Sequence, residues 1–387
     1  MVLKVAQSRS EDLHTGMDDA ARSHMELAGD WPMIEAQLPA NWRELAAIHG
    51  VSPKKQQAHL GAKVTDVVVP LRMVLHHVAT NTSLKTTAAI AAAAGLIDMS
   101  AVALHLWMRR FAPFLTAMLA ALTNVVRDFA AARWAGYEMV IVDASTVSRP
   151  GSKGTTVRVH YALRLTDLKI VEVEVTDEKG GETFKRFAPI AKRGQLWIGD
   201  RGYANPPGVA AITKKGADVL VRVNRGALPL YDIYGSLLDV REKLSRLRPG
   251  VPREWAACVH PEGKTPIRGR LCAVRLPPDK SEEARTRLKR EQGADLTPES
   301  LQMAEFVVLF TTVPRARLVT DQIMELYGLR WQVELSIKRD KSIAGLDRLP
   351  NFRDDTIRAW ILAKLLLTQV ARKIATPEMV AIPPCAA

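Results

Sequence analysis

The sequence predicts an α/β fold, a mixed five-stranded sheet flanked by helices, interrupted by a β-rich insertion and preceded by an all-α N-terminal region. Five β-forming runs lie between residues 137 and 223, and short connections join the first three of them. Residues 1–132 have a helical pattern instead, and two amphipathic helices are expected between residues 320 and 373, the second of them packed on the sheet. The chain has 387 residues, enough for two or three domains with cores of their own.

Two of the predicted strands end in an aspartate. Residues 137–145 read Y-E-M-V-I-V-D-A-S, in which three β-formers lead into Asp143. Residues 195–203 read Q-L-W-I-G-D-R-G-Y, a short strand that ends at Asp200 before a glycine turn and a helix. The remaining strands are expected at 157–165, 170–175 and 218–223. Asp143 and Asp200 can therefore lie side by side on adjacent strands.

A polar pattern stands out within residues 320–341, where a Y-x2-R-x3-E-x6-K spacing is formed by Tyr327, Arg330, Glu334 and Lys341. On one helix of about 3.6 residues per turn, these side chains would fall within roughly 80° of one another. Lys338 joins the same face, and an apolar stripe beside it would pack the helix onto a core. A carboxylate flanked by cations and a phenol suits a metal-bound acid next to phosphates.

This pattern resembles the signature of the IS-four-like insertion-sequence transposases, a branch of the DDE transposases. The stretch W-Q-V-E-L-S-I-K-R-D-K-S-I-A-G-L is similar to that family too, and the resemblance covers residues 135 to about 375. It implies an RNase H-like core with Asp143, Asp200 and Glu334 as catalytic residues and as ligands of two Mg²⁺ ions, for which Mn²⁺ can substitute. Such hard cations prefer oxygen ligands.

The resemblance further implies cut-and-paste transposition of an insertion sequence. Two metal ions would promote strand nicking and strand transfer at terminal inverted repeats; a hairpin intermediate, made in the wider group, stays open. The implied partners are double-stranded DNA, as transposon end and as target, and a second copy in a homodimeric synaptic complex. Two alternatives remain: a catalytically silent, transposase-derived DNA-binding protein, and a metal-dependent nuclease that only hydrolyses DNA.

Several residues are candidates for DNA contacts. Arg330 and Lys341 would hold phosphates, and Tyr327 would donate a hydrogen bond or stack on a base. Each of the two cations taken alone is ordinary helix surface, and Glu334 with Lys338 reads equally as a solvated i,i+4 pair.

The predicted insertion adds further candidates. Trp255 is the only tryptophan between residues 224 and 314. Some relatives hold a flipped base with an aromatic there, although a core tryptophan is the more ordinary interpretation. Arginines in and before the insertion could line a DNA channel: Arg222, Arg225, Arg268 and Arg270.

The predicted organisation has five parts. They are a helical DNA-binding region at 1–132, the first part of the catalytic core at 135–223, the β-rich insertion at 224–314, the second part of the core at 315–375, and a loose tail at 376–387. Residues 85–111 read as helix, turn and helix, with Ser100 as N-cap of the second helix. A helix-turn-helix would bring Arg109 and Arg110 to DNA; a plain helical hairpin is the alternative.

Composition agrees with a polyanionic partner. Lysine and arginine number 54 against 41 acidic residues, for a net charge of +13 and a pI near 9.7. The three cysteines, Cys258, Cys272 and Cys385, have no C-x-x-C spacing, which indicates a reducing cytosol; the resemblance adds association with a bacterial nucleoid. The most apolar run, residues 86–107, is interrupted by Asp98, so no membrane association is expected.

Overall fold

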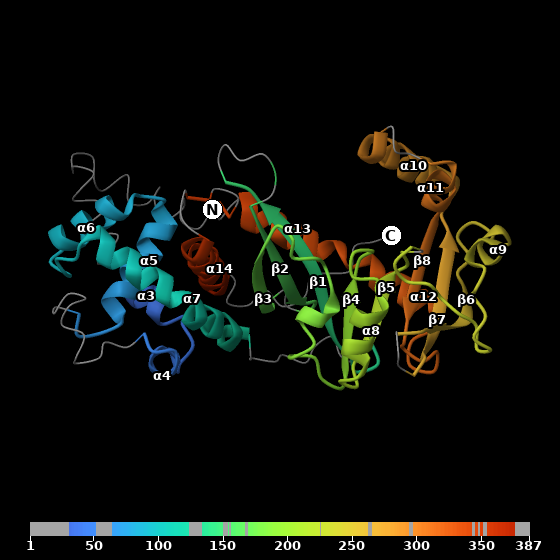
Figure 1. Cartoon of the computed structure of the whole chain (residues 1–387), viewed down its shortest axis with the longest axis horizontal. Helices are drawn as coiled ribbons and strands as arrows, with labels where there is room; N and C mark the ends of the chain where they lie inside the picture. Colours follow the sequence, from blue (N-terminus) through green and yellow to red (C-terminus); the bar gives the residue numbers. More distant parts are fainter. Residues whose placement is uncertain are drawn as a thin grey trace.

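In the computed structural model, an elongated molecule carries a helical part at one end and a large sheet beside it (Figure 1). The residues described are 31–51, 64–123, 134–149, 154, 156–166, 169–224, 226–261, 265–293, 297–342, 345–346, 349–350 and 354–375. The predicted tail at 376–387, the first 30 residues and Arg225 lie outside them.

The helical part is formed, among the described residues, by α3 (Trp31–Glu35), α4 (Trp42–Ile48), α5 (Val68–Thr80), α6 (Leu84–Ala93) and α7 (Ala101–Thr123). The predicted cap of α7 is confirmed, because the Ser100 hydroxyl accepts a hydrogen bond from the Ala103 N–H at 3.1 Å. The helix expected to end at residue 111 continues to Thr123. Its apolar stripe continues too, since Phe114 and Met118 are fully buried.

The sheet contains β1 (Glu138–Val147), β2 (Val157–Arg164), β3 (Ile170–Asp177), β4 (Gln195–Gly199), β5 (Asp218–Arg222), β6 (Arg253–Val259), β7 (Ile267–Arg275) and β8 (Phe306–Thr311). The first five confirm the strands predicted from the sequence. β1, β2 and β3 pair antiparallel, whereas β4 pairs parallel with β1 and β5 pairs parallel with β4. A short 3₁₀ helix, η2 (Phe184–Arg186), lies in the connection from β3 to β4.

Within the described residues the sheet has eight strands rather than the expected five, in the order β3-β2-β1-β4-β5-β8-β7-β6. The extension arises because β8 pairs antiparallel with β5, with Leu220 opposite Thr311, and β7 and β6 follow. Strands expected in an insertion therefore continue the sheet, and their apolar residues share one core with β1, β4 and β5.

The chain after β8 forms the helices α12 (Thr320–Gly328), α13 (Trp331–Ser342) and α14 (Asp354–Ala375). The prediction of a single helix over the signature is wrong, because α12 ends at Gly328, and bonds of the i→i+3 type link Leu326 to Leu329 and Arg330 to Val333. The expectation that the last helix packs on the sheet is corrected as well. Helix α14 packs mainly against α7 and α5, which ties the end of the chain to the helical part.

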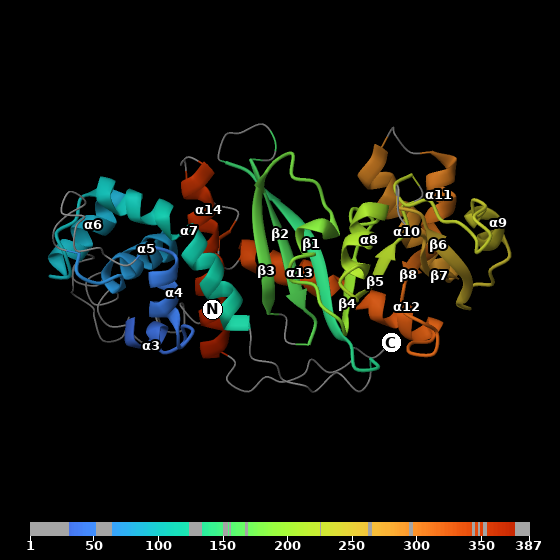
Figure 2. The ribbon, with the colours of Figure 1, turned by 60° about the horizontal axis from the view of Figure 1, so that its bottom comes forward.

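The sheet has a separate core on each face, and the helices divide between them (Figure 2). Met139 and Ile141 of β1 belong to a cluster that includes α7, α12, α13 and α14. Val140 and Val142 belong to the other cluster, which includes α8 (Pro206–Thr213). Because side chains alternate along a strand, Asp143 belongs to the first face, where α13 contacts β1.

Beyond β5 the chain forms α9 (Val240–Ser245), α10 (Pro278–Gln292) and α11 (Pro298–Ala304) around the added strands. The charged segment expected as a solvated helix or loop is the helix α10. It lies with α11 above the far end of the sheet in Figure 1. An ion pair from Arg285 to the buried Glu305, just before β8, fixes α10 to the sheet.

Candidate active site

The two aspartates are neighbours across the β1–β4 pair. The prediction that Asp143 ends its strand is wrong, because β1 continues to Val147, whereas Asp200 directly follows the end of β4. β1 and β4 pair in parallel with Ile141 opposite Ile198, and continuing that register by two residues sets Asp143 opposite Asp200. Each carboxylate accepts a short-range backbone hydrogen bond, Asp143 from the Ala144 N–H at 2.8 Å and Asp200 from the Gly202 N–H at 2.9 Å. Buried β-formers precede each aspartate, and the parallel pairing of β1 with β4 brings the two carboxylates side by side.

Asp143 is the most perturbed carboxyl group of the site. Burial raises its pKa to about 7, and the charges of Asp200 and Glu334 raise it as well. The Ala144 N–H and the Arg330 guanidinium act in the opposite direction. Such a pKa indicates that the carboxyl group is partly desolvated and surrounded by like charges. A cation bound to the carboxylates would offset the repulsion between them.

Glu334 reaches this place from α13, which packs on β1. Arg330 donates a hydrogen bond to Glu334 from the turn between α12 and α13, and its guanidinium lies 5.9 Å from the centre of the Tyr327 ring. Burial alone would lower the pKa of Arg330, but Tyr327, Glu334 and Asp143 raise it. The helix break therefore leaves Tyr327, Arg330 and Glu334 together, although they do not share one helix.

The two lysines of the signature helix are placed differently from each other. The Lys341 ammonium group donates a hydrogen bond to the Thr146 carbonyl at 2.8 Å, which links the end of α13 to the end of β1. Lys338 is exposed on the surface of α13. Lys341 therefore contacts the backbone of β1, and Lys338 lies on the exposed surface of α13.

Other predicted DNA contacts lie away from the carboxylates. Trp255 is on β6, the edge strand, and packs against the core of the opposite face. Arg109 and Arg110 are exposed on α7 in the helical part. Arg270 is buried and donates to the Val313 and Leu318 carbonyls at 2.9 and 2.8 Å, so its guanidinium is a structural group rather than the lining of a DNA channel.

The structure adds a fourth carboxylate, Glu182, which the sequence reasoning missed. It lies so close to Gly202 that a Cβ atom there would collide with one of the carboxylate oxygens. Burial and the charge of Asp200 raise the pKa of Glu182, while Arg158, 3.8 Å away, lowers it. No strand or helix pattern marks this residue, because it lies in the connection after β3 and only the folded chain brings it to Asp200.

Four carboxylates offer the hard oxygen donors that Mg²⁺ or Mn²⁺ takes, and by this chemistry the residues fit such an ion. In the part of the chain that the structure describes, no three acidic, histidine or cysteine side chains are arranged to hold a metal ion. Glu334 forms an ion pair with Arg330 instead. The Glu334 side chain is still 52% exposed and so remains accessible from solvent.

Comparisons with known proteins show the family of the chain. Residues 134–369 match the family described as "Transposase DDE domain". The chain is 30% identical over 325 residues to the "Putative transposase InsL for insertion sequence element IS186A" of Escherichia coli (strain K12), covering 82% of this chain and 87% of that relative. It is 31% identical over 305 residues to the transposase for insertion sequence element IS421 of Escherichia coli, covering 77% and 81%.

These matches define the class of protein, a transposase. This chain belongs to the DDE transposases of insertion sequences. The family cleaves and joins DNA strands, binds DNA and generally uses divalent metal ions. Among the described residues, each helix is too short or too polar to traverse a lipid bilayer.

Proposed function

We propose that this protein catalyses cut-and-paste transposition of its insertion sequence, with Asp143, Asp200 and Glu334 as catalytic residues. The observation that carries the proposal is that Asp143 of β1 lies near Asp200, which follows the paired strand β4, and near Glu334 of α13. The charges of Asp200 and Glu334 both raise the pKa of Asp143. Acids on or just after neighbouring strands, with a helix packed on the same face, suit an RNase H-like core formed by β1–β5. The proposed substrates are the terminal inverted repeats and a target DNA.

Two Mg²⁺ ions, or Mn²⁺ in their place, would be held by these three carboxylates and would activate the attacking oxygen and stabilise the leaving one. The chain itself contributes orientation and charge. Arg330 holds Glu334 and is well placed to turn to a phosphate, since its fork matches phosphate oxygens. Tyr327, beside the same guanidinium, would donate to DNA or stack on a base.

We further propose DNA contacts for residues outside the carboxylate site. Lys338 is an exposed cation on the same helix as Glu334 and would meet the transposon end. Lys341 would support that end by holding β1 against α13, or would exchange its carbonyl for a phosphate. Arg109 and Arg110 of the helical part would contact the inverted repeat, and a second copy would complete the synaptic complex. Binding to chromosomal target DNA would place the protein with the nucleoid of a bacterial cytoplasm.

The test is a reaction of the purified protein with Mg²⁺, a labelled duplex that carries the flanking inverted repeat, and a target plasmid. Joined end–plasmid product, absent with Asp143→Asn, is the expected result. Tight binding without any cut strand would favour a silent DNA-binding relative, and nicks without joining would favour a nuclease. These two outcomes would overturn the proposal, each in favour of a different activity. A hairpin at the cleaved end, seen on a denaturing gel, would show that the reaction passes through that intermediate.

A further inference from the structure

A cavity of about 340 Å³ lies between the end of β5 and the two helices α10 and α11. Three arginines line it, and each comes from a different segment. Arg201 lies in the turn after β4, Arg222 is the last residue of β5, and Arg287 is on α10. The remaining lining includes the apolar side chains of Leu288 and Met303. Cavities of this size hold small ligand groups.

The positive charge of this cavity is not balanced within the described residues. The guanidinium groups of Arg201, Arg222 and Arg287 form no ion pair or hydrogen bond with any described residue. Glu299, the one acidic side chain among the described lining residues, forms an ion pair with Arg241 at 3.5 Å. Arginine stays charged in proteins, so three guanidinium groups repel one another here. An anion that enters the cavity would relieve this repulsion.

The electrostatics of Arg222 agree with that geometry. Burial lowers its pKa, and Arg201, Arg287 and Arg330 lower it further through their charges. Tyr327 acts in the opposite direction. The cavity therefore adjoins the signature residues, and Arg201 directly follows Asp200 in the chain. A group bound in the cavity lies next to the carboxylate site.

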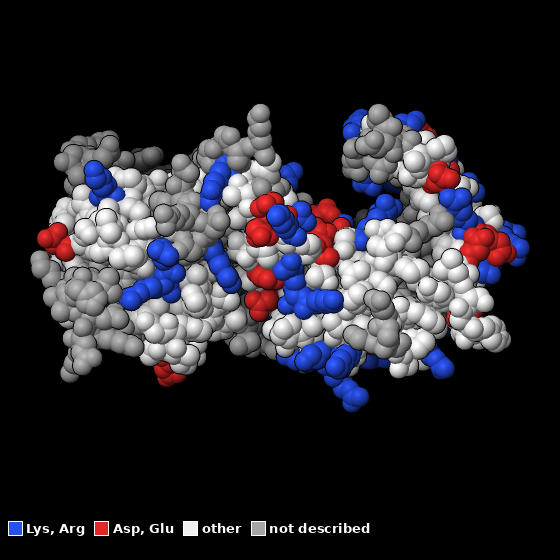
Figure 3. Space-filling model, viewed as in Figure 1, with Lys and Arg blue, Asp and Glu red and all other residues white. Residues whose placement is uncertain are grey.

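The surface around the cavity is open to a long ligand. Arg201 and Arg287 are exposed, whereas Arg222 is half-buried. Figure 3 shows the molecule hollowed beneath the part formed by α10 and α11, with basic side chains gathered there. The helix α10 is held in place by Glu305, which also pairs with Arg275 at 2.9 Å. Arg287 thus projects from a helix that is anchored to the sheet.

We propose that Arg201, Arg222 and Arg287 bind one backbone phosphate of the DNA strand that passes the carboxylate site, so that α10 clamps the strand from the side of the added β-strands. The proposal rests on the proposed function, since it names a DNA contact of the same site. Guanidinium groups suit this role because their forks donate paired hydrogen bonds to phosphate oxygens. The added strands and α10 would then position the strand as well as extend the sheet.

The test measures binding of a labelled duplex with the flanking inverted repeat, in EDTA, over a series of salt concentrations. Arg287→Ala should weaken binding about tenfold and reduce the slope of log affinity against log salt by about 0.9, the value for one phosphate contact. Lys289→Ala is the matched control. It removes one cation from the same helix, about 200° around the axis from Arg287, and should leave affinity and slope unchanged.

A second arm replaces single phosphates near the cleavage point by neutral methylphosphonates. At one position, the methylphosphonate should weaken binding by the unaltered protein as much as Arg287→Ala does. The same methylphosphonate should not weaken binding by Arg287→Ala any further. Equal binding by Arg287→Ala and Lys289→Ala, or additive losses at every position, would overturn the phosphate contact. If the unaltered protein neither cuts nor joins DNA while the Arg287→Ala defect persists, the proposed function fails and the phosphate contact stands.

Discussion

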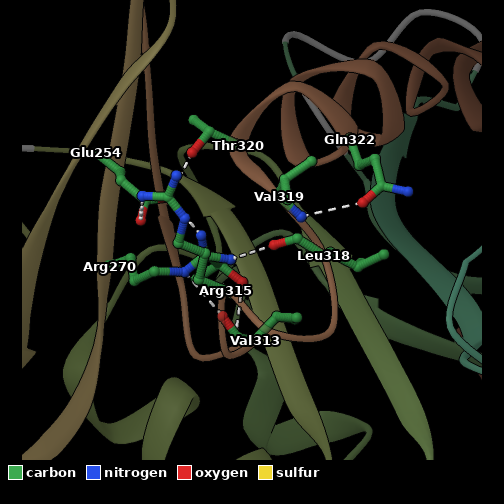
Figure 4. A network of polar contacts seen from close by, with 9 residues as sticks. Glu254, Arg270, Val313, Arg315, Leu318, Val319, Thr320 and Gln322 are labelled. Carbon is green, nitrogen blue, oxygen red and sulfur yellow. Dashed lines mark hydrogen bonds and ion pairs between the residues drawn. The ribbon is translucent and has the colours of Figure 1, made fainter.

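Carboxylates and arginines meet in two regions of this molecule, with opposite results. Around Glu254, the Arg270 and Arg315 guanidinium groups and the Thr320 hydroxyl donate to one carboxylate, and Arg270 also donates to two backbone carbonyls (Figure 4). Although burial alone would raise it, the pKa of Glu254 is lowered by these partners. At Asp143, burial and the neighbouring negative charges outweigh the groups that lower its pKa, and so the pKa is raised to about 7.

The comparison distinguishes charged groups that stabilise the fold from charged groups that are available to bind a ligand. The Glu254 network joins β6 and β7 to the start of α12, and its buried groups are satisfied within the chain. The carboxylates around Asp143 instead repel one another, and a bound cation would reduce this repulsion. Substitutions in the two regions should therefore change different properties, DNA cleavage in one and stability in the other.

The largest effect is expected for Glu334→Gln. This change removes an anionic oxygen donor and nearly preserves shape, so cleavage should fall at least about a thousandfold, equivalent to about 4 kcal/mol of transition-state stabilisation. Binding of the inverted-repeat duplex should persist. Single-turnover cleavage with Mg²⁺ measures the loss. Glu178→Gln, at an exposed carboxylate beyond β3, is the control and should cleave normally; retained cleavage by Glu334→Gln would contradict its role.

Arg270→Ala should instead destabilise the fold. It leaves Glu254 largely buried without its main partner and orphans two carbonyls, which costs about 3–5 kcal/mol for a buried pair broken on one side. Urea unfolding measures the change. Arg268→Ala, at an exposed residue on the same strand, should cost less than about 0.5 kcal/mol. Similar losses in both variants would show that the network does not hold the added strands.

Asp143→Asn should stabilise the metal-free protein at neutral and higher pH. Because the folded-state pKa of Asp143, about 7, lies above the value of an unfolded aspartate, the folded protein keeps a proton that the unfolded chain loses. Stability is therefore lost as pH rises from about 4 through 7. The variant should lack this decline and be more stable by roughly 4 kcal/mol at pH 8. Thermal unfolding in EDTA across that range measures it; an unchanged pH profile would contradict the raised pKa.

The smallest effect on stability is expected for Gly202→Ala. The new Cβ atom would collide with the end of the flexible Glu182 side chain, which can swing away, so the cost should stay below about 1 kcal/mol. The displaced carboxylate should nevertheless alter the Mg²⁺ concentration that cleavage requires. A double-mutant cycle with Glu182→Ala measures the coupling. Additive effects of the two changes would show that Gly202→Ala does not act through the Glu182 carboxylate.

Much of the fold could be predicted from local patterns. The β-forming residues before Asp143 and Asp200 favour strands, and the structure has strands at all five predicted places. The helix break at Gly328 was not predicted, because the apolar period continues through it and only the tightened turn reveals it. The position of α14 was not predicted either, since an amphipathic stripe specifies that a face is buried but not against which partner.

The sequence by itself determined the β-forming runs that lead into Asp143 and Asp200, the signature spacing and membership in the transposase family, because each depends on residues close together in the chain. Only the tertiary structure decided which distant groups meet. It brought Glu182 to Asp200, joined β8 to β5, and surrounded one cavity with Arg201, Arg222 and Arg287. Such contacts arise from how faces pack across the sheet, and no local periodicity encodes which residues a packed face will bring together.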